Sequence, residues 1–311
     1  MRARLAPSPS GDLHLGHARS FLLAWWQARA LGGEIVLRME DLDTERCVAG
    51  SEQSILEDLT WLGLDWDGAI VRQSERRHLY DSALQTLGTT GRLYPCVCTR
   101  KDLAEAARAP HPGESPASSY PGTCRGLYKD LEHARTLTGK PAAWRFTVPP
   151  GERQFEDGCA PPYSEDPCLT SGDFPVTRKD GQPAYQLAVV VDDADQSITH
   201  VLRGADLRSS TIRQLLLQEA LNLPHPSWFH VPLVVDSSGQ RLAKRNPSLT
   251  LAALRDHGWT APQLVHWAAT SCGLTGSPTR TARDWIPDFD LNALPPNNVP
   301  APNPSTGKPP A

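Results

Sequence analysis

The segment LAPSPSGDLHLGHARS, from Leu5 to Ser20, is the feature that most constrains this chain. It joins a short stretch that reads as a first strand, residues 2–6, to a stretch in which apolar side chains recur at intervals of three and four. Those positions are Ala18, Phe21, Leu22, Trp25 and Ala28. The spacing predicts an amphipathic helix that Gly32 and Gly33 end. The strand-like run EIVLRM follows at residues 34–39. A strand, a loop, a helix and a second strand predict a βαβ unit and therefore a parallel sheet.

The rest of the pattern extends this α/β reading. Helices are predicted at residues 51–62, 77–87 and 211–221, with two short ones near 249–257 and 261–272. Strands are predicted at 185–193, 197–204 and 228–235. The first of these contains a continuous apolar run, as expected for a central parallel strand that is buried on both faces. The segment between Cys96 and Cys124 is rich in Pro, Gly and Ser, which predicts a loop-rich insertion. Residues 295–311 are rich in proline and are predicted to be disordered.

Composition excludes several classes of function. With 31 Lys and Arg against 35 Asp and Glu, the net charge is −4, so a non-specific nucleic-acid binder is disfavoured. No apolar run is long enough to span a membrane, and the first residues lack the apolar core of a signal peptide. Seven unevenly spaced cysteines argue against a disulfide framework and for a reducing compartment. We therefore expect a cytoplasmic protein that does not bind membranes.

The loop before the first helix is a candidate phosphate site. A helix N-terminus presents unpaired N–H groups and the positive end of a dipole, where anions bind. His14 and His17 lie three residues apart and can point at one ligand, while Gly11 and Gly16 let the backbone approach it. Two imidazoles there could stabilise charge that develops in a transition state. A capped turn with surface histidines and a two-histidine metal site are the alternatives.

The motif PSPSGDLHLGH resembles the ATP-binding signature of class I aminoacyl-tRNA synthetases, in the form of their glutamate and glutamine branch. The resemblance implies a Rossmann-type catalytic domain whose first helix begins at the motif. It also implies that His14 and His17 contact the phosphates of ATP. The remaining ATP-binding positions of this loop are Pro9, Gly11 and Gly16.

Class I enzymes carry a second signature after the last strand of the sheet, and GQRLAKRNPS stands there in this chain. By the resemblance, Lys244 is the catalytic lysine that steadies the leaving pyrophosphate, and Arg241 binds ATP beside it. Arg241, Ala243 and Arg245 replace the Lys, Ser and Ser of the family's pattern. Arg241 keeps a positive charge, although a planar guanidinium differs from an ammonium in geometry. Taken alone, the segment RLAKR reads as a solvated basic turn.

An acidic amino acid needs arginines for its carboxylates and a carboxylate for its ammonium group. Arg4, Glu40 and Arg203 all fall at the carboxyl ends of predicted strands, where open α/β sheets bind ligands. The resemblance implies that Glu40 holds the α-amine and Arg203 the side-chain carboxylate. The full predicted set for L-glutamate is Arg4, Leu5, Ala6, Pro7, Ser8, Glu40, Tyr185 and Arg203. A solvated acidic turn and a surface salt bridge are the plain alternatives for Glu40 and Arg203.

Cys96, Cys98 and Cys124 offer three thiolates, and structural zinc usually takes four ligands. His111 is a chemically reasonable fourth ligand. The resemblance implies Tyr120 instead, because shortened glutamyl-type synthetases carry Cys-x-Cys followed by Tyr-x-x-x-Cys. The predicted ligands are thus Cys96, Cys98, Tyr120 and Cys124, with three metal-free cysteines as the alternative.

Because only a short stretch follows Lys244, we expect no helical domain of the kind with which glutamyl-tRNA synthetases read the anticodon. The chain resembles a short family within this class, the glutamyl-queuosine tRNA(Asp) synthetases. That implies an ATP-dependent ligase that activates L-glutamate without tRNA and transfers it to queuosine in the anticodon of tRNA(Asp). Mg²⁺ and one structural Zn²⁺ are expected, as is a monomer. The alternatives are an atypical glutamyl-tRNA synthetase that charges a tRNA 3′ end, and a catalytically inactive RNA-binding or regulatory relative.

Five segments are expected from this reading. Two halves of the catalytic domain occupy residues 1–95 and 176–250, the second half carrying the loop of the second signature. A zinc-binding insertion at 96–175 separates the two halves. A short helical part at 251–290 and the proline-rich tail at 291–311 complete the chain.

Overall fold

The first forty residues form the predicted βαβ unit. In the computed structural model, which describes residues 1–99, 101–102, 120–242 and 247–302, β1 (Arg2–Leu5) pairs in parallel with β2 (Glu34–Met39). Helix α1 (Leu15–Ala30) connects them. Gly32 follows the helix with a φ of 61°, a left-handed conformation that glycine adopts without strain.

The parallel sheet extends on both sides of this unit. Strand β3 (Val71–Arg72) pairs with β2, and β9 (His200–Gly204) pairs with β10 (Ser227–Val231), all in parallel. The segment before β9 lies beside β1, where the Thr199 N–H donates to the Arg2 carbonyl at 2.9 Å. Strands β6 (Arg153–Asp157) and β7 (Ala160–Glu165) form an antiparallel hairpin beside β10. The carboxyl ends of β1, β2 and β9 therefore meet at one edge, as predicted for an α/β ligand site.

One predicted strand is wrong. Residues 185–193 do not form a central strand but most of helix α7 (Tyr185–Asp195), which packs against α3 (Arg77–Thr89) and α8 (Ser210–Leu221). The apolar run Leu187–Val191 is buried throughout. A short apolar run without polar alternation suits a fully enclosed helix as well as a central strand, and here the neighbouring helices decide the outcome. The predicted helix at 51–62 is confirmed as α2 (Ser51–Trp61).

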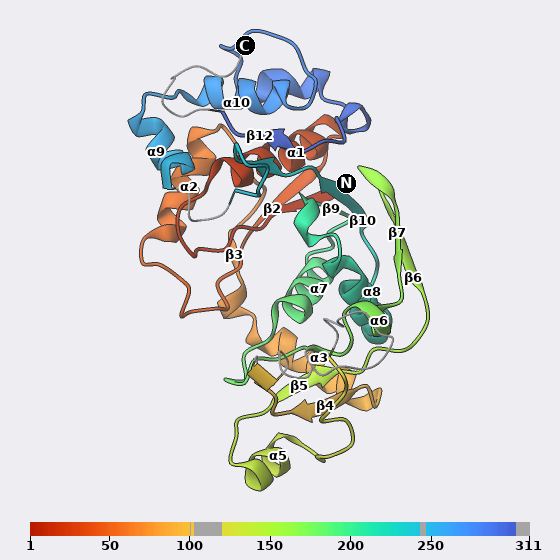
Figure 1. Cartoon of the computed structure of the whole chain (residues 1–311). Helices are drawn as coiled ribbons and strands as arrows, with labels where there is room; N and C mark the ends of the chain where they lie inside the picture. Colours follow the sequence, from red (N-terminus) through yellow and green to blue (C-terminus); the bar gives the residue numbers. More distant parts are fainter. Residues whose placement is uncertain (100, 103–119, 243–246, 303–311) are drawn as a thin grey trace.

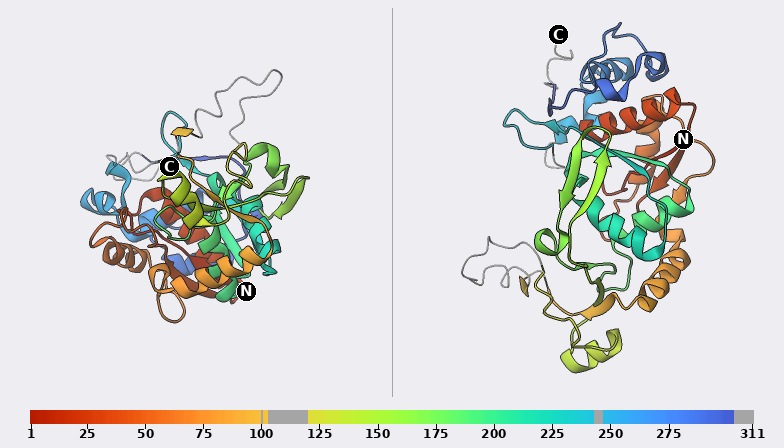
Figure 2. Two further views of the ribbon diagram at one scale, coloured as in Figure 1. Left: turned by 90° about the horizontal axis from the view of Figure 1, so that it is seen from below. Right: turned by 90° about the vertical axis from the view of Figure 1, so that its right-hand side faces the viewer.

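Part of the predicted insertion forms a small sheet of its own, whereas its strands β6 and β7 join the sheet of β10. Strands β4 (Leu93–Cys96), β5 (Ala143–Phe146) and β8 (Phe174–Pro175) form an antiparallel sheet, flanked by α5 (Leu131–Thr138) and α6 (Pro167–Thr170). Figure 1 shows α5, β4 and β5 at the end of the molecule opposite α9 and α10. The right-hand view in Figure 2 shows the same elongated arrangement.

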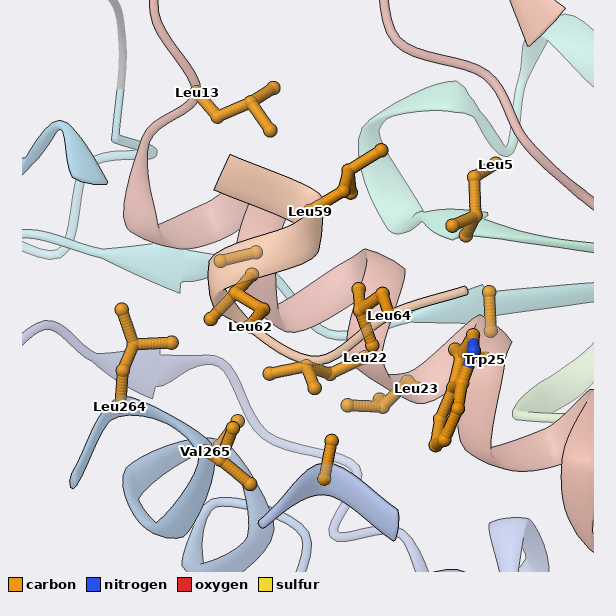
Figure 3. Close-up of a cluster of buried hydrophobic side chains, with 14 of the residues drawn as sticks. Leu5, Leu13, Leu22, Leu23, Trp25, Leu59, Leu62, Leu64, Leu264 and Val265 are labelled. Carbon is orange, nitrogen blue, oxygen red and sulfur yellow. The ribbon is translucent and has the colours of Figure 1, made fainter. Parts of the chain in front are cut away.

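The C-terminal part covers the outer side of α1. Its elements are η3 (Pro247–Leu249), α9 (Leu251–Asp256), α10 (Ala261–Thr270), η4 (Ala282–Asp288), η5 (Leu291–Ala293) and β12 (Val299–Pro300). Helix α1 contacts β1 on one side and η4 and α10 on the other, so it is buried on more than the single face that its spacing predicts. The Trp26 indole donates to the Ala282 carbonyl at 2.8 Å. Side chains from α1, α2 and α10 form one apolar cluster (Figure 3).

Two further predictions, for the last long strand and for the C-terminal tail, differ from the structure. The strand predicted at 228–235 is divided: β10 ends at Val231, and β11 (Val234–Val235) follows Pro232, which lacks the N–H that a continuous strand would use. Part of the tail predicted to be disordered is ordered, because β12 pairs in parallel with β11. Residues 303–311 lie outside the described residues.

The start of the C-terminal part is hydrogen-bonded to the first loop. The Leu251 N–H donates to the Leu13 carbonyl at 2.8 Å, and His14 and Thr250 form an isolated antiparallel bridge. The loop before α1 is thus fixed between β1 and α9. Within the described ranges, none of the helices combines the length and apolar character needed to cross a bilayer.

Candidate active site

A cavity of about 550 Å³ opens at the carboxyl ends of β1, β2 and β9. Most of the residues predicted for ATP or glutamate line it. They are Arg4, Ala6, Pro7, Ser8, Gly11, His14, Gly16, His17, Glu40, Tyr185, Arg203 and Arg241. Two predicted residues do not line it: the Leu5 side chain belongs to the apolar core, and Pro9 is a buried residue of the loop. Lys244 lies outside the described residues.

The two histidines form the N-terminal cap of α1. The His14 Nδ1 accepts from the Gly16 N–H at 3.1 Å, and the His17 Nδ1 accepts from the His14 N–H at 3.3 Å. The rings stack with centroids 3.7 Å apart. Because both Nδ1 atoms accept, each neutral ring carries its proton on Nε2, which makes Nε2 a donor. A Cβ at position 16 would lie 3.0 Å from the His14 ring, so Gly16 leaves room for that ring.

Hydrogen bonds fix the loop in front of this cap. Gly11 has a φ of 127°, a conformation reserved for glycine, and exchanges hydrogen bonds with the Ser51 side chain at the start of α2. The Glu40 N–H donates to the Pro7 carbonyl, and the Val48 N–H donates to the Pro9 carbonyl, both at 2.9 Å. The loop and the acidic segment after β2 therefore form one hydrogen-bonded wall of the cavity.

A buried ionic network places Arg4 and Glu40. The Arg4 Nε lies 3.4 Å from an Asp193 carboxylate oxygen, and Arg38 bridges Asp193 at 2.7 Å and Glu40 at 3.3 Å. Burial raises the pKa of Glu40 even though Arg38 and Arg4 favour its ionised form. Asp193 lies on α7. Its ion pairs with Arg4 and Arg38 were not predicted, because this segment was expected to be a strand.

Arg203 faces the same cavity from β9, and its guanidinium group has no carboxylate partner among the residues the structure describes. Its Nη2 donates to the Thr211 hydroxyl at 2.8 Å, and its Nε donates to the His230 Nε2 at 3.1 Å. The guanidinium lies 4.8 Å from the centre of the Trp228 ring. Burial lowers the pKa of Arg203. A buried cation of this kind is poorly compensated until an anion reaches it.

The second loop reaches the cavity through Arg241. This guanidinium pairs with Asp206, which follows β9, at 2.6 Å, and the Arg241 side chain is otherwise well exposed. The Leu242 N–H donates to the Val234 carbonyl at 3.1 Å. The segment therefore folds back on β11 before the residues of the RLAKR motif that are not described. Asp206 lines the cavity but was not predicted to do so.

The cysteine cluster assembles as predicted. The sulfur atoms of Cys96, Cys98 and Cys124 all lie within 4.8 Å of one another. The Tyr120 Oη lies 3.5 Å from the Cys96 sulfur and 3.6 Å from the Cys98 sulfur. Tetrahedral zinc with bonds of about 2.3 Å needs donors roughly 4 Å apart. The donor set is therefore compatible with zinc, and His111, the alternative ligand, lies outside the described residues.

Comparison with known proteins places this geometry in a family. Residues 1–283 match the family model described as tRNA synthetases class I (E and Q), catalytic domain. The chain belongs to this family. The glutamyl-Q tRNA(Asp) synthetase of Symbiobacterium thermophilum is 46% identical over 309 residues, covering 96% of this chain and 95% of the relative. The enzyme of that name from Nitratidesulfovibrio vulgaris is 45% identical over 298 residues, covering 93% and 88%.

Solved structures of the same synthetase family agree with the fold. A glutamate tRNA ligase from Elizabethkingia meningosepticum superposes with a TM-score of 0.82 at 28% identity, and the match covers 96% of this chain. The glutamate-tRNA synthetase of Elizabethkingia anophelis gives a TM-score of 0.81 at 28% identity. The match covers 66% and 68% of those two chains, so this chain spans about two thirds of their length. The predicted α/β class I synthetase catalytic domain is confirmed.

Proposed function

We propose that this protein uses ATP to activate L-glutamate without tRNA and transfers the glutamyl group to queuosine in the anticodon of tRNA(Asp). Relatives 45–46% identical over nearly the whole chain carry the corresponding name. The structural observation that carries the proposal is the buried Arg203, without a carboxylate partner among the described residues, in the cavity that also holds Glu40. A dicarboxylic amino acid supplies the carboxylate that Arg203 lacks, and its ammonium adds a second cation beside Glu40, which already pairs with Arg38.

The proposed glutamate site follows from this pairing. Arg203 takes the side-chain carboxylate and Glu40 takes the α-ammonium, while Tyr185 closes the site from the first turn of α7. Arg4, Ala6, Pro7 and Ser8 line the wall beneath the ligand. Leu5 supports this wall from the core instead of touching the amino acid, because it points to the opposite face of β1.

In the proposed first step an oxygen of the glutamate α-carboxylate attacks the α-phosphorus of ATP. The bond to pyrophosphate breaks, and the glutamyl-adenylate forms. His14 and His17 at the start of α1, with Lys244, stabilise the charge that moves onto the phosphate oxygens. ATP enters with Mg²⁺, and Arg241 exchanges Asp206 for a phosphate. Transfer of the glutamyl group to queuosine then releases AMP. Most of the rate comes from positioning and electrostatics.

We further propose that the cysteine cluster holds one structural Zn²⁺ through Cys96, Cys98, Tyr120 and Cys124. Arg145 supports this set, since its guanidinium lies 3.9 Å from the Tyr120 ring. We expect the protein to act as a cytoplasmic monomer.

Pyrophosphate exchange tests the activation step. Purified protein should exchange labelled pyrophosphate into ATP when L-glutamate is the only other addition. Glutamine lacks the second carboxylate that Arg203 requires, and aspartate places its carboxylate one methylene short, so both should support far less exchange. Exchange that requires added tRNA, or that is equal for the three amino acids, would contradict the proposal.

The likeness to glutamate-tRNA ligases favours a second candidate, the charging of a tRNA 3′ end. The attachment point of labelled glutamate on tRNA(Asp) separates the two candidates. Nuclease fragments should carry the label on the anticodon base and not on the 3′-terminal ribose. Label on the terminal ribose would replace the proposed acceptor while leaving the activation step intact.

A further inference from the structure

A chain of buried polar groups runs behind Arg203, on the side away from the cavity. Arg203 and His230 are direct register partners on the parallel strands β9 and β10. The His230 Nε2 accepts from the Arg203 Nε at 3.1 Å, and the His230 Nδ1 lies 2.9 Å from an Asp157 carboxylate oxygen on β6. All three side chains are buried.

These contacts determine the proton position on His230. A carboxylate only accepts, so the Nδ1–H donates to Asp157, and the Nε2 lone pair is left to accept from Arg203. Burial is the main cause that lowers the pKa of His230, and nearby Arg203 and Arg208 act in the same direction. Asp157 also accepts from the His230 N–H at 3.1 Å and from the Arg208 guanidinium at 2.9 Å. The ring is therefore neutral and held in one tautomer.

The same contacts fix the plane of the guanidinium. Two of its three nitrogens are committed to protein acceptors, the Nε to His230 and the Nη2 to Thr211. The Thr211 hydroxyl lies 3.1 Å from the His230 Nε2, so the three groups form a closed triangle. The Trp228 ring covers the guanidinium face. A cation that lacks a carboxylate partner within the described part of the chain is thus immobilised before any ligand arrives.

We propose that His230, oriented by Asp157, is a positioning residue that holds Arg203 at the depth where it meets the side-chain carboxylate of glutamate. This inference rests on the proposed function, in which Arg203 takes that carboxylate. A guanidinium that cannot move toward a shorter ligand discriminates glutamate from aspartate by reach. A loosely held guanidinium would follow the shorter carboxylate and lose that discrimination.

Two polar variants separate positioning from simple support of the fold. In H230Q the amide oxygen reaches the place of Nε2 and still accepts from Arg203. In H230N the amide reaches only the place of Nδ1, so the contact with Asp157 survives and the contact with Arg203 is lost. H200Q is the matched control, because His200 is a histidine at the far end of β9, outside the cavity.

The readouts are KM and kcat for glutamate and aspartate in pyrophosphate exchange, with KM for ATP and thermal unfolding recorded for each variant. We expect H230N to raise KM for glutamate about tenfold or more. Its kcat and its KM for ATP should stay within about twofold of wild type, and its preference for glutamate over aspartate should shrink. H230Q should restore most of the affinity, and H200Q should match wild type.

Equal KM values for glutamate in H230N and H230Q would overturn the inference, as would a parallel loss of kcat and ATP affinity in H230N. If wild type exchanges pyrophosphate with glutamate and H230N behaves identically, the inference alone fails. If wild type neither binds glutamate in calorimetry nor exchanges pyrophosphate with it, the proposed function and the inference fail together.

Discussion

The carboxyl group of Glu40 is held in surroundings that disfavour its ionised form. Its carboxylate is enclosed by the cavity wall, and burial raises its pKa, although Arg38 and Arg4 oppose that shift. A raised carboxyl pKa means that folding favours the protonated form. Any stabilisation from Glu40 is therefore fully present below the unfolded-state pKa and is lost as the pH rises through the folded-state pKa. Above the folded-state pKa the ionised Glu40 costs stability, which a ligand ammonium offsets.

Replacing Glu40 should separate stability from binding. We expect E40Q to keep or raise the thermal midpoint of the ligand-free protein at neutral pH, because the buried charge is gone. KM for glutamate should rise roughly ten- to hundredfold through loss of a charged hydrogen bond. Thermal denaturation and pyrophosphate exchange measure the two effects, with E45Q as an exposed control from the same acidic segment. A destabilised E40Q with unchanged KM would exclude Glu40 from the amino-acid site.

Site residues within a recognisable motif could be predicted from the sequence. Site residues that depend on contacts between distant segments could not. Strand alternation explains Leu5: it stands between Arg4 and Ala6, so when those two face the cavity it faces the core. Because side chains alternate between the two faces of a strand, the sequence alone predicts that placement. By contrast, nothing in the local sequence connects Arg203 with His230, since their contact depends on how β9 and β10 pair.

At the scale of elements, the start of α1 combines a structural and a chemical task. His14 is the N-cap residue, and its Nδ1 accepts the Gly16 N–H. Helix ends need such an acceptor, and asparagine supplies one as well as any residue. The ring additionally places an Nε2–H donor farther from the backbone than the shorter amide of asparagine can reach. Capping and phosphate contact can therefore be removed separately.

We expect H14A to lose about 1 kcal/mol of unfolding free energy together with roughly a hundredfold or more in kcat. H14N should keep the stability and lose only the rate. Urea denaturation and pyrophosphate exchange give the two quantities. Full exchange activity in H14N would show that the cap, and not the imidazole, is what the site requires.

The insertion offers a second test at this scale. Phenylalanine at position 120 keeps the ring that packs under Arg145 and removes only the Oη beside the thiols. We expect Y120F to weaken zinc binding at least about tenfold in competition with a chromophoric chelator. Y128F is the matched control, because Tyr128 packs against the same cysteine cluster. Wild-type zinc affinity in Y120F would leave Tyr120 as a hydrogen-bond partner and not a ligand.

Helices and strands that are bounded by glycine or a polar loop could be predicted from the sequence. An element that is enclosed by other helices could not. The glycines after α1 and the polar loop before it bracket that helix, so its bounds follow from the sequence. Helix α7 has an apolar run rich in valine, which favours strand by propensity. Burial between α3 and α8 overrides this preference, and Asp192 and Asp193, both buried, join α7 to Arg76, Arg38 and Arg4 through ion pairs. Such long-range pairing leaves no local pattern.

The whole molecule joins parts that the sequence keeps far apart. The apolar core combines α1, α2 and α10 (Figure 3), although α10 begins more than 200 residues after α1 ends. The sequence predicted the short C-terminal helices but not the elements that they pack against. An apolar helix face shows that it will be buried, but not against which element. The domain boundaries stay a prediction.

The hydrogen bond from Leu251 to Leu13 has a consequence for observing ATP binding. A nucleotide that stiffens the loop before α1 should also protect the Leu251 amide proton, which belongs to α9. In hydrogen–deuterium exchange a non-hydrolysable ATP analogue should slow exchange in a peptide that contains Leu251, while peptides from α5 keep their rates. Unchanged exchange at Leu251 in the presence of saturating analogue would contradict this coupling. One backbone amide, distant along the chain, thus serves as a label-free reporter of the nucleotide.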